Sequence, residues 1–302
     1  MTEFGRLLTA MVTPFAGDGS VDYAAAQRLA LALLDSGSDG LVVAGTTGES
    51  PTLTHDEKLR LFAEVKSAVR ERGAVIAGTG TNNTAESIEL TREAEGTGVD
   101  GVLAVVPYYN KPTQEGLYRH FAAIAEATRL PLVLYNIPGR TSVNMTAETT
   151  VRVSRIENVA GIKEGSGDLQ QIAAIVEHAR EGFRVWSGAD EDTLPMLACG
   201  CYGVISVISH LTGLQVKSMI EDYVAGRNDE AARTHRRLLP LIDALFCATN
   251  PIPVKYALRQ LGVPVGAPRL PLCEPDDATA AGIMAEVRRH KIDLPVAVEA
   301  RS

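Results

Sequence analysis

A lysine that directly follows a run of apolar residues is the most informative feature of the sequence. Lys163 comes after Val-Ala-Gly-Ile at 159–162, which has the composition of a buried strand. A buried lysine is costly unless its amine is paired, neutral or used in a reaction. A neutral amine is a nucleophile that can attack a ketone and form an imine. An ion pair with Glu164 or another carboxylate explains the pattern equally well, so the spacing alone leaves both interpretations open.

Other polar side chains also follow apolar runs. The turn Thr-Thr-Gly-Glu at 46–49 could hold a carboxylate or phosphate through hydroxyls and amides, although an ordinary strand-to-helix turn has this composition too. Tyr135 could relay a proton, and the alternative is a packed ring with a bonded hydroxyl. Arg140 places a cation on the turn Pro-Gly-Arg, which suits a carboxylate ligand. Considered alone, Arg140 would be interpreted as a surface residue.

Eight short apolar segments alternate with amphipathic segments up to about residue 226. Most of the apolar segments are continuous, which is typical of parallel strands buried on both faces. We expect strands at 7–14, 40–44, 74–78, 101–106, 131–135, 159–163, 183–187 and 203–207. The intervening segments have helical periodicity, and we expect helices at 23–36, 55–72, 84–96, 115–128, 146–155, 168–180, 192–199 and 214–225.

This alternation predicts an α/β fold, a closed (βα)8 TIM barrel. An open doubly wound sheet is the alternative, but Gly-Thr-Gly at 78–80 lacks the third glycine of a dinucleotide-binding loop. After residue 226 we expect only helices, at 228–246, 251–261 and 275–290. We therefore predict a catalytic barrel domain at 1–226 and a C-terminal helical domain at 227–302 that packs on the barrel. Because barrel sites form at the carboxyl ends of the strands, the polar groups should converge on one mouth.

Composition and missing motifs narrow the function classes. The 302 residues carry 29 Lys and Arg against 37 Asp and Glu, a net charge of −8, which gives no general attraction for nucleic acid. No apolar stretch approaches the roughly 18 residues of a membrane span, and the first residues do not resemble a secretion signal. The four cysteines include no Cys-x-x-Cys pair, and the six histidines include no pair at metal-ligand spacing. We expect free thiols, no metal and a cytoplasmic protein.

Several long motifs occur in register along essentially the whole chain: GTTGES (45–50), VVPYYNKP (105–112), YNIPGRT (135–141), GIKE (161–164), SGAD (187–190), GVISV (203–207) and NPIPVKYAL (250–258). With these motifs the chain resembles the dihydrodipicolinate synthase family. That family belongs to the pyruvate-dependent class I aldolases, which also include N-acetylneuraminate lyase. The resemblance implies a (βα)8 barrel with a C-terminal helical domain, a homotetramer built as a dimer of dimers, and no metal or organic cofactor.

The resemblance also implies an activity and a set of residue roles. The activity is the condensation of pyruvate with L-aspartate 4-semialdehyde to 4-hydroxy-tetrahydrodipicolinate, the committed step of diaminopimelate and lysine biosynthesis. Lys163 would form the Schiff base and Tyr135 would shuttle protons. Thr47 and Tyr109 would complete the relay, with Tyr109 reaching into the site of a neighbouring subunit. The implied substrate-binding residues are Thr46 and Thr47 for the pyruvate carboxylate, Arg140 for the carboxylate of the aldehyde, and the backbone positions Gly188 and Ile205.

Two other functions are weighed against this one. A related aldolase or lyase could act on another aldehyde or sugar acid, but those enzymes usually lack the arginine of PGRT and often have serine in place of Thr46. A catalytically silent pyruvate sensor is the second alternative. The intact set of Lys163, Tyr135, Thr47 and Tyr109 argues against it.

A further set of residues matches the site at which lysine inhibits many relatives: Ser50, His55, Asn82, Glu86 and Tyr108. Lys58 stands where the sensitive bacterial enzymes have a histidine. A cation that faces a cationic ligand weakens its binding, so we predict weak or absent inhibition by lysine. Ala189 also departs from the family pattern, because it replaces an acidic residue that is common in this motif.

Overall fold

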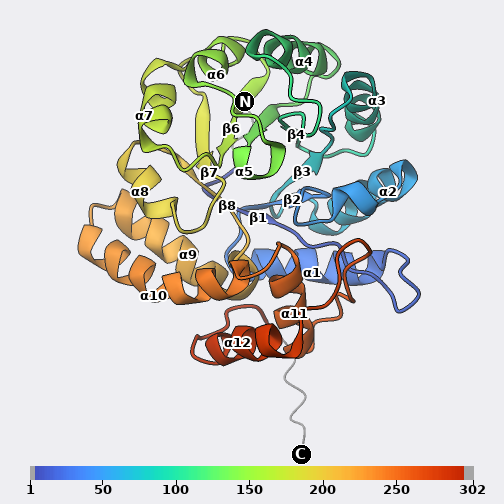
Figure 1. The fold of residues 1–302 in the computed structure, drawn as a ribbon, viewed down its shortest axis with the longest axis vertical. Coiled ribbons are helices and arrows are strands. Elements are labelled where there is room, and N and C mark those ends of the chain that lie inside the picture. The colour runs from blue at the N-terminus through green and yellow to red at the C-terminus, as the bar shows by residue number, and fades with distance from the viewer. Residues whose placement is uncertain (1–3, 296–302) are drawn as a thin grey trace, which may run out of the picture.

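Eight parallel strands form a closed barrel in chain order (Figure 1). The computed structural model describes residues 4–295. The strands are β1 (Leu7–Ala10), β2 (Gly40–Val43), β3 (Ala74–Gly78), β4 (Gly101–Val105), β5 (Leu132–Asn136), β6 (Val159–Glu164), β7 (Arg184–Ser187) and β8 (Gly203–Ser206). Because β1 pairs with β8, the predicted (βα)8 barrel is confirmed and the open doubly wound sheet is excluded.

Helices alternate with the strands and cover the outside of the barrel. They are α1 (Tyr23–Asp35), α2 (His55–Val69), α3 (Thr84–Glu95), α4 (Gln114–Glu126), α6 (Ala147–Val153), α7 (Leu169–His178), α8 (Thr193–Ala198) and α9 (Ser209–Val224). The sequence did not predict two short helical turns, η1 (Ser50–Thr52) and α5 (Pro138–Thr141), which follow β2 and β5. The start of α9 was also predicted too late, because the helix continues across a kink at Thr212 (φ −129°, ψ 38°).

Two hydrophobic layers explain why the strands are continuously apolar. One side of each strand faces the barrel interior, where Leu8, Val42, Ile76, Val133 and Trp186 belong to one buried cluster. The other side faces the helices and belongs to a second, larger cluster. A strand that is buried on both faces has no polar face, so its sequence shows no alternation.

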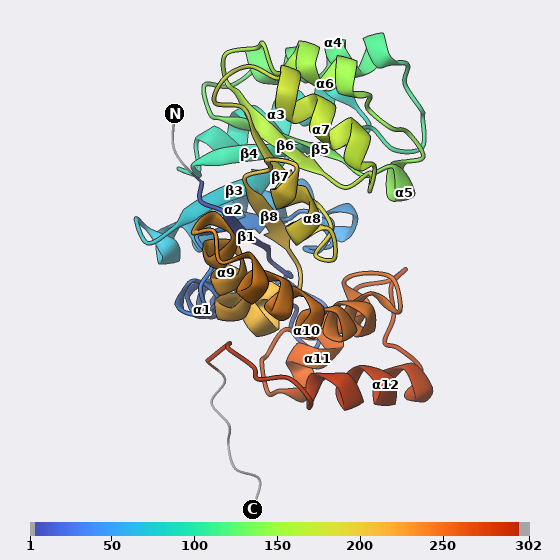
Figure 2. The same cartoon turned by 90° about the vertical axis from the view of Figure 1, so that its left-hand side faces the viewer.

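The helices after residue 226 form one group beside α9 (Figure 2). They are α10 (Asn228–Phe246), α11 (Ile252–Gln260) and α12 (Asp277–Val287). Leu241 of α10 and Leu258 of α11 are fully buried in the same cluster as the helix-facing sides of the strands, so this group packs on the barrel. The predicted boundary at 226/227 falls between α9 and α10, and the ends of the two predicted domains, 1–3 and 296–302, lie outside the described residues. The division into two domains stays a prediction.

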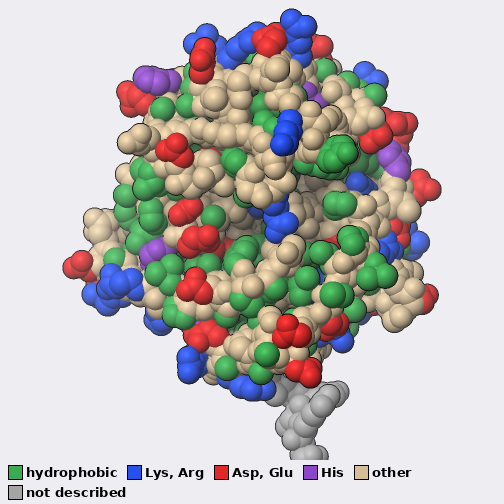
Figure 3. Space-filling model, viewed as in Figure 1, with side chains coloured by type: hydrophobic (Ala, Val, Ile, Leu, Met, Phe, Trp, Pro, Cys, Tyr) green, Lys and Arg blue, Asp and Glu red, His purple; other side chains and the backbone are tan. Residues whose placement is uncertain are grey.

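The surface carries charges of both signs. On the face in Figure 3, acidic and basic side chains are interspersed, and a hollow lies near the centre of the view. Within residues 4–295, no helix combines the length and hydrophobicity that a membrane crossing requires.

Candidate active site

The strand register places Lys163 in the barrel interior. Lys163 pairs with Tyr135 on β5 and with Trp186 on β7, and both aromatic residues belong to the interior cluster. The register between β5 and β6 shifts by one residue at Leu132/Val133. Without this irregularity Lys163 would stand beside Asn136, so the shift sets the pairing of the lysine with the tyrosine. The Nζ atom of Lys163 lies 4.4 Å from the centre of the Tyr135 ring, and Lys163 is only 6% exposed.

Glu164 does not pair with Lys163. Successive residues of a strand point to opposite faces, so the two side chains diverge. The Glu164 carboxylate instead accepts hydrogen bonds from Asn136 Nδ2 at 3.0 Å and from the Ser166 amide at 2.7 Å. An ion pair of Lys163 with Glu164 is therefore wrong, whereas a pairing of Lys163 with another carboxylate stays a prediction.

Burial shifts the Lys163 amine toward its nucleophilic form. Burial lowers the pKa of Lys163 to about 8, the Asp190 carboxylate acts in the opposite direction, and the Arg140 guanidinium lowers the pKa further. An ordinary lysine is almost fully protonated near neutral pH. Lys163 therefore has a substantial neutral fraction at mildly alkaline pH, as attack on a ketone requires.

Asp190 is a site residue that the sequence analysis did not single out. It is 4% exposed, and its Oδ2 atom accepts hydrogen bonds from the amides of Val207 at 2.8 Å and Ile208 at 3.1 Å. Burial raises the pKa of Asp190, while its contacts and the charge of Lys163 lower it. The residue is the last of the quoted SGAD motif, and a carboxylate three positions after the end of β7 was the available signal.

The hydroxyl of Tyr135 contacts Thr46 rather than Thr47. Burial raises the pKa of Tyr135 to about 12, and a hydrogen bond with the Thr46 side chain opposes that rise. The phenol is therefore neutral at physiological pH and can donate a hydrogen bond. Thr47 Oγ1 accepts a hydrogen bond from Asn250 Nδ2 at 2.9 Å. The predicted role of Thr47 in the proton relay stays a prediction, and the geometry favours Thr46.

Arg140 stands at the mouth, on α5. Its guanidinium is exposed and donates a hydrogen bond to the carbonyl of Asn250 at 3.3 Å. Arg140, Thr46 and Tyr135 line one cavity. Asn250 is a second residue that the sequence analysis assigned no role, although it begins the quoted NPIPVKYAL motif. It bonds to both Thr47 and Arg140, so it connects the two predicted carboxylate-binding groups.

The remaining predicted site residues occupy different places. The Gly188 amide donates to the Glu164 carbonyl at 2.7 Å, and a Cβ atom there would meet that oxygen at 3.0 Å. Ile205 is buried in the interior cluster opposite Leu8. Tyr109 is 87% exposed with φ 72°, so it does not join Tyr135 within this chain.

Three of the six predicted regulatory residues line the same cavity. Ser50, Lys58 and Tyr108 line it together with Thr46, Tyr135 and Arg140. Burial lowers the pKa of Lys58, and Glu86 acts in the opposite direction. Burial and the charge of Glu86 raise the pKa of Tyr108, and a hydrogen bond with the Asn82 backbone lowers it. His55 is bound elsewhere, because its Nε2 atom lies 2.8 Å from Glu93 Oε2. Residues 4–295 contain no group of three or more His, Cys, Asp or Glu side chains that could hold a metal ion.

Together, the fold and the site define a (βα)8-barrel protein with a buried amine at the carboxyl ends of its strands, the arrangement of an imine-forming aldolase. Residues 3–289 match the model of the dihydrodipicolinate synthetase family, and the chain belongs to that family.

Known relatives can be aligned with this chain over nearly its full length. The 4-hydroxy-tetrahydrodipicolinate synthase of Dehalococcoides mccartyi is 62% identical over 98% of this chain and 100% of its own length. The structure of DHDPS from Cyanidioschyzon merolae with lysine bound has a TM-score of 0.93 and 49% identity, covering 94% of this chain and 97% of that one. The dihydrodipicolinate synthase from Acinetobacter baumannii, complexed with pyruvate, has a TM-score of 0.92 and 37% identity, covering 97% of this chain and 100% of that one.

Proposed function

We propose that the chain condenses pyruvate with L-aspartate 4-semialdehyde to give 4-hydroxy-tetrahydrodipicolinate, the committed step of diaminopimelate and lysine biosynthesis. The observation that carries this proposal is the buried Lys163 amine against the Tyr135 ring, with a pKa of about 8, at the mouth of a barrel of this family. The names of the relatives support the reaction, and the pyruvate complex of the Acinetobacter baumannii enzyme supports the first substrate.

The reaction begins with attack of the neutral Lys163 amine on the pyruvate ketone. A carbon–nitrogen bond forms, and loss of water gives the imine. The protonated imine withdraws electrons, so a methyl proton leaves and an enamine forms. The enamine carbon attacks the aldehyde carbon, and the new oxygen takes up a proton. The substrate amine then adds to the imine carbon, closes the ring and expels Lys163 as the free amine.

Neighbouring residues bind the substrates and move protons. The neutral Tyr135 hydroxyl, in contact with Thr46, donates and recovers the protons of imine formation and ring closure. The hydroxyls and amides of the turn at 46–48 hold the pyruvate carboxylate. The exposed Arg140 guanidinium binds the carboxylate of the incoming aldehyde through two hydrogen bonds. Gly188 and Ile205 complete the wall of the site.

The catalytic unit is a homo-oligomer, a tetramer built from two dimers. The exposure of Tyr109, at 87%, supports this proposal because the residue is free to reach the site of a neighbouring copy and to extend its relay. A Tyr109→Phe variant tests the point. If the relay crosses the interface, this variant should turn over more slowly than the wild type, while Lys163 of each chain still forms an imine with pyruvate. The free thiols of all four cysteines suit action in a reducing compartment, the cytoplasm.

The activity is tested by following pyruvate consumption with and without L-aspartate 4-semialdehyde, with Lys163→Ala as the control. Consumption that requires the aldehyde, disappears in the variant and yields the cyclised product supports the proposal. No consumption by a folded wild-type protein refutes it, and cleavage of sugar acids is then the activity to assay.

Arg140 separates this reaction from that of a related lyase. Arg140→Met should raise the KM for the aldehyde strongly while borohydride still traps the pyruvate imine, because the cation binds only the second substrate. Equal use of the aldehyde by variant and wild type would point to a different second substrate.

A further inference from the structure

A fully buried lysine outside the reaction centre connects the C-terminal helices to the turn after β2. Lys255 lies on α11 and is 0% exposed. Its Nζ atom donates hydrogen bonds to Glu49 Oε1 at 2.7 Å, the Thr13 carbonyl at 3.0 Å and the Ala267 carbonyl at 3.3 Å. A lysine ammonium has three donors, so all of them are used. The side chain is therefore bound in one place and has no donor left for a substrate.

The turn that Lys255 contacts has a strained backbone. Ala44 and Glu49, at its two ends, have φ values of 51° and 56°, in the left-handed region that residues other than glycine rarely adopt. Such conformations persist where the surrounding structure over-determines them. The strained segment contains Thr46, which lines the cavity beside Tyr135, and Thr47, which bonds to Asn250. An external restraint on the turn is therefore also a restraint on these two hydroxyls.

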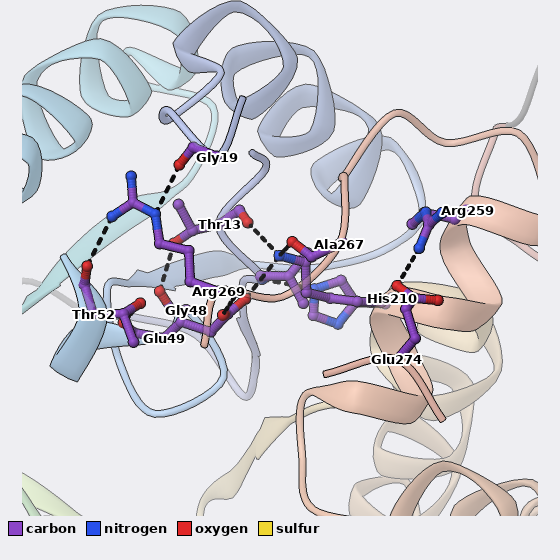
Figure 4. Close-up of polar contacts among 12 residues, drawn as sticks. Thr13, Gly19, Gly48, Glu49, Thr52, His210, Arg259, Ala267, Arg269 and Glu274 are labelled. Carbon is purple, nitrogen blue, oxygen red and sulfur yellow. Dashed lines mark hydrogen bonds and ion pairs between the residues drawn. The ribbon is translucent and has the colours of Figure 1, made fainter. Parts of the chain in front are cut away.

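The contacts of Lys255 converge on this turn from two sides. Figure 4 labels the groups at which they end, Thr13 and Glu49. One contact runs directly to Glu49, which is 2% exposed. The other passes through Thr13, whose hydroxyl donates to the Gly48 carbonyl at 2.6 Å. The second carboxylate oxygen of Glu49 accepts from the Arg269 amide at 2.9 Å, so the turn is held on this side as well.

We propose that Lys255 and Glu49 are positioning residues, and that their buried ion pair lets the C-terminal helices set the geometry of the substrate-binding turn. The role of that turn in holding pyruvate rests on the proposed function. Neither residue touches the reacting atoms. The C-terminal helices therefore influence the geometry of the active site, although none of their residues takes part in a reaction step.

The test compares two double variants with matched chemistry. Glu49→Gln with Lys255→Met removes both charges of the buried pair, so neither is left uncompensated, and Met fills the space of the lysine stem. Arg259→Met with Glu274→Gln removes a second ion pair on the same helix. That pair is partly exposed and lies away from Glu49 in Figure 4. Thermal unfolding and circular dichroism establish that each protein is folded.

Two readouts follow, and the first does not depend on activity. Hydrogen exchange of the amides at 44–50, measured without substrate, should accelerate about tenfold or more in the buried-pair variant, because the turn opens more often. The KM for pyruvate should rise about tenfold, more than kcat falls, because the misplaced turn binds the carboxylate poorly. The Arg259/Glu274 variant should match the wild type in both. A single Glu49→Asp variant, which keeps the charge beside Lys255 and only shortens the side chain, should show smaller changes in the same direction.

The outcomes separate this inference from the proposed function. A folded buried-pair variant with wild-type exchange at 44–50 and wild-type KM would overturn it, and so would equal effects in the control variant. If the double variant does not fold, the charge-conserving Glu49→Asp variant decides by the same two measurements. If the proposed function is wrong, the wild-type protein will show no turnover. Hydrogen exchange of the amides at 44–50 would still show whether the buried ion pair restrains the turn.

Discussion

The amine of Lys163 and the ring of Tyr135 lie side by side on adjacent strands, with 4.4 Å between Nζ and the ring centre. This contact keeps the nucleophile and a neutral phenol within one buried space. It exists because the pairing of β5 with β6 shifts by one residue at the start of the two strands. The amine and the tyrosine ring are therefore already in contact before any substrate binds.

The rate of imine formation should rise as the pH increases through about 8, the value to which burial lowers the pKa of Lys163. The sign follows from the chemistry, because only the deprotonated amine attacks the ketone. Below this pH the rate should fall about tenfold for each pH unit, as the neutral fraction does. Single-turnover trapping of pyruvate across the pH range measures the profile. A flat profile between pH 7 and 9 would contradict the assignment.

Asp190→Asn should move that profile to lower pH. The Asp190 carboxylate stabilises the Lys163 ammonium, so removing its charge makes the proton easier to lose. The amide oxygen of asparagine can still accept from the Val207 and Ile208 amides, so the fold should be retained. Asp192→Asn, a nearby acid that does not affect the pKa of Lys163, should leave the profile in place. A shift in the control but not in the Asp190 variant would refute this role.

Thr46 and Thr47 should differ in their effects. Thr46→Val removes the hydroxyl that contacts Tyr135, so proton transfer should slow and kcat should fall about 100-fold or more. Thr47→Val removes an acceptor from Asn250, so the KM for pyruvate should rise while kcat changes less. Steady-state kinetics with both variants decides the matter. The reverse pattern would restore the relay that the sequence predicts for Thr47.

Lysine should inhibit weakly or not at all. The Lys58 ammonium lines the cavity beside Ser50 and Tyr108 and repels a cationic ligand. Lys58→His removes this fixed charge at alkaline pH and should make turnover more sensitive to lysine. Arg60→His, an exposed change on the same helix, should have no such effect. Inhibition of the wild type by sub-millimolar lysine would contradict the prediction.

The barrel could be predicted from the sequence because each strand is marked by a short local pattern of residues. Continuous apolar runs mark strands buried on both faces, and a polar residue at the end of such a run must face the mouth of the barrel. Lys163, Tyr135 and Arg140 could therefore be placed correctly. The early part of α9 was missed because its polar residues suggest a loop, whereas His210 is fully buried and accepts a hydrogen bond from the Val12 amide at 3.1 Å.

Contacts between distant segments could not be predicted in this way. The bond between Asn250 and Thr47 joins residues 203 positions apart, and that between Lys255 and Glu49 joins residues 206 positions apart. Neither pair has a spacing that indicates contact, because their approach depends on how the C-terminal helices pack. The one-residue shift that pairs Lys163 with Tyr135 is likewise a property of the assembled sheet.

The assignment of Lys163 as the nucleophile is tested most directly by identifying the lysine that forms the imine. The protein is incubated with pyruvate, reduced with borohydride and digested, and the modified peptide is sequenced by mass spectrometry. We expect the mass of one reduced pyruvate on Lys163, and none on Lys255, whose three donors are all used within the fold. Lys163→Ala should abolish the modification. Modification of another lysine, or none in a folded wild-type protein, would contradict imine formation at Lys163.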